Sequence, residues 1–201
     1  MNRLELNPPL LIMTMGYPGA GKTFFSRQFA ELHKLPCLSE DRMRFELFEN
    51  PQFNNDEQDI ISRVFDHALE QVMKTGATVV CDGDFSGAKS RQRIEALAKS
   101  SGYRTLIIWL QTDINTSGTR ALNRDRRNLD SKYAFNLSQD TFNKLSSQLR
   151  RPSEKEDFVV ISGKHAFKGQ ALTVLRKITE LYANGIVSQQ TSSPISGRLI
   201  Q

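Results

Sequence analysis

The sequence has few of the residues that build disulfide, redox or metal sites. It contains two cysteines and three histidines in 201 residues. Cys37 and Cys81 have no metal-like spacing and lie in apolar, strand-like runs, which predicts two buried free thiols in a reducing, cytoplasmic protein. The histidines, His33, His67 and His165, are scattered and form no metal or catalytic set. The chemistry of this protein must therefore come from other side chains.

Long hydrophobic runs are also absent. No apolar stretch approaches the ~20 residues that span a bilayer. The N-terminal stretch MNRLELNPPLL lacks the apolar region and the small-residue cleavage site of a signal peptide. No internal repeat and no second domain can be recognised. With 38% hydrophobic and 24% charged residues, the composition predicts a soluble globular domain without a membrane partner.

The strongest motif is GYPGAGKT at residues 16–23. It follows an apolar run and precedes a helical pattern, which is the context that the phosphate loop G-x-x-x-x-G-K-[ST] requires. Glycines let backbone N–H groups approach phosphate oxygens, and the helix adds its own unpaired N–H groups and dipole. We expect Lys22 to reach the β- and γ-phosphates and Thr23 to ligate Mg²⁺. The predicted nucleotide-binding residues are Gly16, Pro18, Gly19, Ala20, Gly21, Lys22, Thr23 and Phe24.

Strand-like and helical patterns alternate along the rest of the chain. After the strand that precedes the phosphate loop, apolar or β-branched runs predict strands at residues 35–38, 77–81, 106–110 and 158–161. This alternation predicts an α/β fold of three layers, in which helices cover both faces of a five-stranded parallel sheet. Ligands of such sheets bind beyond the carboxyl ends of the strands. The segments expected at that edge are the phosphate loop and residues 39–44, 82–87 and 112–113.

The segment SEDRMR at residues 39–44 offers a candidate acid–base group. Ser39 can cap a helix, and Asp41 and Arg44 share a face of its first turn because they are three residues apart. Asp41 could accept the proton of an acceptor hydroxyl, while Arg44 could hold an anionic acceptor or brace Asp41. The alternative is that Glu40 and Asp41 only favour the helix N-terminus electrostatically. The spacing alone leaves both readings open.

Two aspartates follow the third predicted strand. Asp82 can hold Mg²⁺ directly or through water, although Asp-Gly is also a common turn. Asp84 and Arg91 are further candidates for acceptor binding, and only one of Arg91 and Arg93 is expected to face the site. Residues 84–87 match the D-x-x-G element of GTP switches, but NKLS at residues 143–146 lacks the aspartate that recognises guanine. We therefore do not expect a GTP switch.

A basic helix is predicted over residues 114–127. Arg120, Arg124 and Arg127 fall at i, i+4 and i+7 and would form one stripe. Such a stripe could fold over the nucleotide, with Arg124 neutralising the transferring phosphoryl group. A solvated helix face or a nucleic-acid patch is the alternative. The net charge of +5 is compatible with a polyanionic partner but does not demand one.

In combination, these motifs resemble the P-loop kinase family of AAA-type ATP-binding proteins, which includes the polynucleotide 5′-hydroxyl kinase domain and zeta-toxin-like kinases. The resemblance runs from Leu10 to Ile161 and includes Pro152 followed by Glu156. It implies that Asp41 is the general base, that Arg44 contacts the acceptor and that the arginine stripe forms a mobile lid. Relatives often have D-[TA]-[TN] where this chain has Asp-Gly-Asp, so the acceptor pocket can differ.

The sequence thus predicts an ATP- and Mg²⁺-dependent phosphotransferase over residues 1–184, followed by a disordered tail over residues 185–201. The acceptor would be the 5′-hydroxyl of a nucleic acid or nucleotide, or a small molecule. The alternative function is an ATP-binding regulatory protein that hydrolyses ATP slowly or not at all. The sequence does not indicate the oligomeric state.

Overall fold

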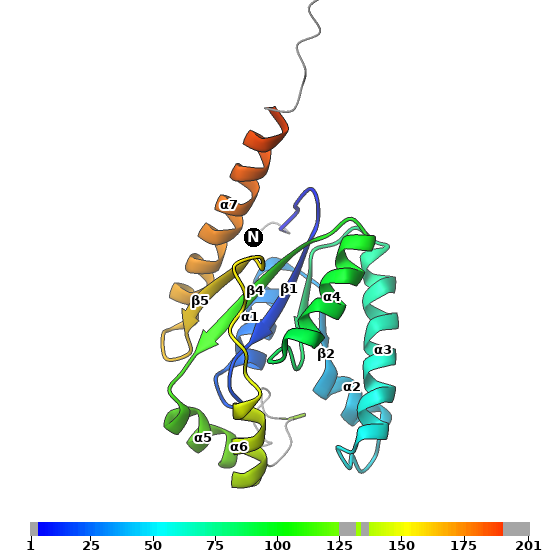
Figure 1. Ribbon diagram of the computed structural model, residues 1–201, viewed down its shortest axis with the longest axis vertical. Coiled ribbons are helices and arrows are strands. Elements are labelled where there is room, and N and C mark those ends of the chain that lie inside the picture. The colour runs from blue at the N-terminus through cyan, green and yellow to red at the C-terminus, as the bar shows by residue number, and fades with distance from the viewer. Residues whose placement is uncertain (1–3, 125–131, 134–136, 191–201) are drawn as a thin grey trace, which may run out of the picture.

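The computed structural model describes residues 4–124, 132–133 and 137–190, with side chains placed as far as residue 183. Five parallel strands form one sheet in the order β2-β3-β1-β4-β5 (Figure 1). The strands are β1 (Leu10–Met15), β2 (Cys37–Ser39), β3 (Val79–Asp82), β4 (Arg104–Gln111) and β5 (Phe158–Ser162). The predicted five-stranded parallel α/β fold is confirmed.

Helices cover both faces of this sheet. α1 (Lys22–His33) and α7 (Phe167–Gln190) pack on one face, while α3 (Asn55–Met73) and α4 (Ala88–Ser100) pack on the other. α2 (Glu40–Leu47) follows β2 and contacts α3. α5 (Ile114–Leu122) and α6 (Gln139–Ser147) contact each other beyond the carboxyl end of β4 (Figure 1). We find no described helix with the length and apolar character that a bilayer crossing demands.

The central strand β1 is buried on both sides. Leu10 and Ile12 belong to the core under α1 and α7, whereas Leu11, Met13 and Met15 belong to the core under α3 and α4. A strand with apolar residues on both faces is typical of a covered parallel sheet. β1 pairs with β3 on one side and with β4 on the other. The loop after β1 therefore lies where the strand order reverses, the usual ligand position in α/β sheets.

Two predicted helix boundaries are wrong. The helix predicted over residues 114–127 ends at Leu122, because Asn123 caps it and donates from Nδ2 to the carbonyl of Thr119 at 3.0 Å. The last helix continues to Gln190, past Gly185, where the tail was expected to begin. One glycine costs a helix only about 1 kcal/mol, so it does not by itself end one. Residues 191–201 lie outside the described residues.

The two cysteines differ in burial. Both are free thiols, and Cys81 is buried in β3 as predicted. Cys37 is exposed, and it lies on β2, an edge strand of the sheet. The prediction of a buried thiol is wrong for this residue.

Candidate active site

The phosphate loop is held in its shape by close packing at its glycines. Gly19 has φ +82°, and a Cβ atom on it would come within 2.2 Å of the carbonyl oxygen of Ser117 on α5. Gly21 is the N-cap of α1 in a left-handed conformation, and no side chain caps this helix. By contrast, side chains cap four other helices: Ser39, Asn54, Asp113 and Ser138. The first turn of α1 is thus built to offer its N–H groups to an anion.

Lys22 points back over the loop. Its Nζ atom donates to the carbonyl oxygens of Gly16 at 2.9 Å and Tyr17 at 3.2 Å. Burial lowers the pKa of the Lys22 ammonium, and the charges of Asp82 and Asp84 oppose that shift. A cation at this position lies among the backbone groups that would surround bound phosphates.

Asp82 and Thr23, the two predicted magnesium ligands, lie together. The Asp82 carboxylate is buried, hydrogen-bonds the Thr23 side chain and accepts from Oγ of Ser39 at 3.4 Å. Burial raises the pKa of Asp82 to about 6, and nearby Asp41 adds to the rise. Among the described residues no three His, Cys, Asp or Glu side chains form a metal site. A hydroxyl and one carboxylate fit Mg²⁺, which keeps several of its waters.

Asp41 and Arg124 interact electrostatically within this site. The Asp41 carboxyl reaches solvent, but surrounding protein atoms reduce its hydration and raise its pKa; Arg124, Lys22 and Arg44 act in the opposite direction. Burial lowers the pKa of the Arg124 guanidinium, while Asp41 and Asp82 raise it. The predicted base, the predicted transition-state arginine and the phosphate-loop lysine therefore interact with one another.

The predicted arginine stripe does not form as one helical face. Arg124 lies beyond the end of α5 and interacts with the carboxylates of the site. Arg120 lies within α5, is exposed, and donates from Nη1 to the carbonyl of Gly163 at 3.2 Å. A Cβ atom on Gly163 would lie 2.3 Å from the carbonyl oxygen of Ala20, so this contact is close to the phosphate loop. Arg127 lies outside the described residues.

Arg44 was predicted either to contact the acceptor or to brace Asp41, and its side chain is turned into the protein. Its side chain is buried at 3% exposure and donates to the carboxylate of Glu57 at 3.2 Å and to Gln58 on α3. Its guanidinium also lies 4.8 Å from the ring centroid of Phe53. Arg44 thus holds α2 against the start of α3, and its charge lowers the pKa of Asp41. The structure favours the bracing role that the spacing had left open.

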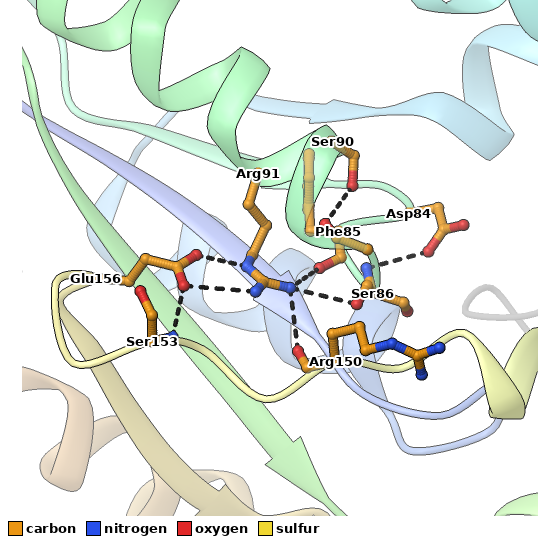
Figure 2. Close-up of polar contacts among 9 residues, drawn as sticks. Asp84, Phe85, Ser86, Ser90, Arg91, Arg150, Ser153 and Glu156 are labelled. Carbon is orange, nitrogen blue, oxygen red and sulfur yellow. Dashed lines mark hydrogen bonds and ion pairs between the residues drawn. The ribbon is translucent and has the colours of Figure 1, made fainter.

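Arg91, the other arginine predicted to bind the acceptor, is turned into the protein. It is 1% exposed and its guanidinium makes five hydrogen bonds within the protein (Figure 2). Nε and Nη2 donate to the carboxylate of Glu156, and Nη1 donates to the carbonyls of Phe85, Ser86 and Arg150. The backbone N–H of Arg150 donates to Ser86 in turn. Arg91 therefore clamps the loop after β3 to the segment that follows α6.

Glu40 is a site residue that sequence reasoning missed. It is 7% exposed, and its carboxylate accepts from the backbone N–H of Asp84 at 3.2 Å. A Cβ atom on Gly83 would come within 2.9 Å of the carboxyl carbon of Glu40. Burial raises the pKa of Glu40 to about 7. The signal was the glycine in Asp-Gly-Asp, because Gly83 leaves the space that this carboxyl group fills.

Two other predicted residues lie at the edges of the site. Asp84 is exposed, accepts from the backbone N–H of Ser86 at 3.2 Å and raises the pKa of Lys22 electrostatically. Phe24 is 39% exposed and packs edge-on against Phe167 at a centroid distance of 6.4 Å. Their roles in acceptor and nucleotide binding stay predictions.

A cavity of about 470 Å³ opens beside the phosphate loop, between Tyr17, the carboxyl ends of β4 and β5, and the segment after α6. Its wall contains Trp109, Leu149 and Lys164, but none of the residues predicted to bind the nucleotide or the acceptor. The charged side chains described above, by contrast, lie around the phosphate loop. We therefore place the phosphates over the loop backbone and not in this cavity.

Comparison with known proteins agrees with this geometry. A family model described as an AAA domain matches residues 11–152. No curated protein matches the chain. A structure from Chloroflexus aurantiacus is 15% identical, with a TM-score of 0.68 over 85% of this chain and 98% of that one.

Two similar structures contain nucleotides. APS kinase from Mycobacterium tuberculosis, in complex with AMPPNP and APS, is 15% identical with a TM-score of 0.63, over 86% of this chain and 98% of that one. Kti12 from Chaetomium thermophilum, in complex with ADP-AlF3, is 17% identical with a TM-score of 0.65, over 85% of this chain and 97% of that one. At these identities the similarity shows a shared fold, the P-loop NTPase fold.

Proposed function

Because the chain belongs to the AAA domain family, we propose that it is an ATP-dependent phosphotransferase that moves the γ-phosphate to a hydroxyl acceptor. The observation that carries this proposal is the position of Asp41. A hydrolysing or merely nucleotide-binding protein needs the phosphate loop, Lys22 and the Thr23–Asp82 pair. Asp41 is an additional carboxylate outside that pair, and it interacts with both Lys22 and Arg124.

In this proposal the loop amides and Lys22 hold the β- and γ-phosphates. Thr23 and Asp82 would hold Mg²⁺, which supplies charge neutralisation on the phosphates when it is bound. Arg124 interacts with the charges of Asp41, Asp82 and Lys22, and there a guanidinium can stabilise the charge of the transferring phosphoryl group. The nucleotide is thereby enclosed by cations from two separate segments.

Asp41 acts on the acceptor. Its carboxylate takes the proton of the acceptor hydroxyl while the acceptor oxygen bonds to the γ-phosphorus and the bond to the bridging oxygen of ADP breaks. Desolvation raises the pKa of Asp41, which makes its carboxylate a stronger base, while the charges of Arg124 and Lys22 act in the opposite direction.

The test is Asp41→Asn, which keeps the shape of the side chain and removes the base. Turnover should fall by about 10²–10⁴, while ATP affinity, measured by calorimetry, stays within a few-fold of the unmodified protein. Asp66→Asn is the matched control, because Asp66 pairs with Arg93 on the surface between α3 and α4. Full turnover in Asp41→Asn would sink the assignment of this residue as the base.

One observation favours the alternative, an ATP-binding regulatory protein with slow hydrolysis. Arg44, the residue expected to hold the acceptor, is buried against α3. A screen of hydroxyl acceptors with γ-labelled ATP separates the two functions. Label that is found only in free phosphate, for every acceptor, supports the regulatory protein; label in an acceptor supports the phosphotransferase.

A further inference from the structure

We propose that Glu40 positions Asp41, because its carboxylate joins the first turn of α2 to the loop after β3, and that Arg91 holds this loop in place. The inference rests on the proposed phosphotransferase, since Asp41 is its proposed base. Glu40 and Arg91 act through other groups and are therefore positioning residues.

The position of the Asp41 carboxyl depends on the backbone of α2. An aspartate side chain is short and adopts few rotamers, so its carboxyl can move little once the backbone is fixed. Asp41 lies in the first turn of α2, directly after Glu40. A general base must lie within hydrogen-bond reach of the proton that it accepts, and a displacement of about 1 Å can cost about 100-fold in rate. Contacts that hold this turn therefore bear on turnover.

Two side chains join the start of α2 to the end of β3. Oγ of Ser39 donates to the carboxylate of Asp82 at 3.4 Å, and the same oxygen accepts from the backbone N–H of Arg42. Oε2 of Glu40 accepts from the backbone N–H of Asp84 at 3.2 Å. The Glu40 bond is the shorter of the two bonds to the β3 end, and Glu40 is buried, so water competes little for it.

Gly83 makes room for the Glu40 carboxyl. A Cβ atom at position 83 would lie 2.9 Å from the carboxyl carbon of Glu40 and 3.2 Å from its Cγ atom. A side chain at this position would therefore displace the carboxyl group from the N–H of Asp84. Glu40 packs directly against the backbone of the loop, which makes it a suitable attachment between α2 and β3.

The loop after β3 is also held by Arg91 (Figure 2). Nη1 of Arg91 donates to the carbonyls of Phe85 at 3.1 Å and Ser86 at 3.2 Å. The carbonyl of Ser86 also accepts from the backbone N–H of Arg150 at 2.9 Å. The guanidinium is itself fixed, because Nε and Nη2 donate to the Glu156 carboxylate at 2.6 and 3.4 Å. The second half of the loop is thereby held in place.

Hydrogen bonds connect the two halves of this loop. The backbone N–H of Ser86 donates to Oδ1 of Asp84 at 3.2 Å (Figure 2). The backbone N–H of Phe85 donates to the carbonyl of Gly83, also at 3.2 Å. Together with the contacts of Arg91, these bonds form an unbroken series that ends at the first turn of α2. A contiguous series of this kind can carry a displacement from one end to the other.

Hydrogen exchange of backbone amides tests the inference without any acceptor. Glu40→Ala removes the acceptor of the Asp84 N–H, whereas Glu40→Gln keeps an oxygen there and loses only the charge. The amides of Asp84 and Arg42 should exchange at least about 10-fold faster in Glu40→Ala, and at nearly the unmodified rate in Glu40→Gln. The amide of Ile12, on the buried central strand, reports the global stability of each variant.

Arg91→Lys tests the distant end of the series. Lysine keeps the charge of the ion pair, but its three donors cannot replace the five hydrogen bonds of the guanidinium. The amide of Arg42 should again exchange faster relative to that of the central strand. Arg93→Lys is the matched control, because Arg93 is a partly exposed residue of the same helix, and it should change nothing. An unchanged Arg42 amide in Glu40→Ala would overturn the role of Glu40, and one in Arg91→Lys would overturn that of Arg91.

Turnover tests whether the held turn serves Asp41. The rate of ADP formation from ATP counts transfer to every acceptor, water included. In Glu40→Ala kcat should fall about 10- to 100-fold. The KM for ATP should not change, because the phosphate loop is built on β1, α1 and α5. Glu40→Gln should recover most of the loss.

The double variant Asp41→Asn/Glu40→Ala separates positioning from a general structural defect. Without its base the protein should lose no further turnover when Glu40 is removed, whereas a structural defect would multiply with the loss in Asp41→Asn. Equal fold-losses in the two backgrounds would overturn the inference. Full turnover in Asp41→Asn would contradict the phosphotransferase assignment instead, and the exchange rates would still decide whether Glu40 holds the turn.

Discussion

The phosphate loop and the Arg91 clamp are both polar, both buried in part and both next to β3, yet they are built on opposite rules. In the clamp every part of the guanidinium meets a carboxylate or a carbonyl of the protein (Figure 2). Beside the phosphate loop, by contrast, the buried Asp82 has a raised pKa, because burial disfavours the charge of its carboxylate. Polar groups whose hydrogen bonds and charges are satisfied by the protein stabilise the fold. A group whose charged form is disfavoured by burial is expected to be stabilised by a bound ligand.

Removing one partner of the clamp should give the largest effect on stability. Arg91→Met leaves the Glu156 carboxylate without its ion-pair partner and removes one hydrogen bond from each of three carbonyls. The unfolding free energy should fall by about 3–5 kcal/mol, as measured by urea denaturation. The double variant Arg91→Met/Glu156→Leu should recover part of this loss, because no unpaired charge remains.

Arg93→Met is the matched control for Arg91→Met. Arg93 is on the same helix and pairs with Asp66, but its side chain is 35% exposed. Its loss should lower the unfolding free energy by less than about 1 kcal/mol. Equal losses in the two variants would break the comparison, since the clamp would then be an ordinary surface pair.

Asp82→Asn should increase the unfolding free energy, in contrast to the substitutions in the clamp. The folded pKa of Asp82, about 6, lies above that of an unfolded aspartate, so folding favours the protonated form and stability falls as pH rises from about 4 to about 6. At pH 7.5, without nucleotide or Mg²⁺, Asp82→Asn should raise the unfolding free energy by about 1–3 kcal/mol. The gain should disappear near pH 4. A loss of stability at pH 7.5 would show that the protein stabilises the Asp82 carboxylate, as it stabilises the ion pair of the clamp. It would contradict the assignment of Asp82 to the ligand site.

The smallest effect is expected at the boundary between the two regions. Gly83→Ala brings a Cβ atom to 2.9 Å from the carboxyl carbon of Glu40 and should lower the unfolding free energy by about 1 kcal/mol. In a Glu40→Ala background the same substitution should be nearly neutral. The cycle of four variants measures this coupling. Additive effects would show that Glu40 does not fill the space above Gly83.

The phosphate loop and the sheet could be predicted because each depends on residues close together in the sequence. Periodic apolar residues select strands and helices, and Gly16 to Thr23 form one contiguous motif. Ser39 was correctly expected to cap α2, where it accepts from the backbone N–H of Arg42.

The roles of the arginines could not be predicted, because they depend on partners far along the chain. Arg91 meets Glu156, 65 residues later, and Arg44 meets Glu57 and Gln58 on the next helix. Nothing near either arginine in the sequence distinguishes a buried clamp from a free ligand contact. The position of Glu40 in the site could not be predicted for the same reason, since its hydrogen-bond partner Asp84 is 44 residues away.

The central place of β1 also has a consequence for protein synthesis. β1 ends at Met15, but its neighbours β3 and β4 are complete only at Asp82 and Gln111. At the usual rates of translation, the ribosome needs roughly 5–20 s to add those residues. Until β3 is complete at Asp82, a strand that is buried on both faces in the finished protein has none of its sheet partners, and β4 is added only later. Strand β1 is therefore an apolar segment of the nascent chain that a chaperone could protect.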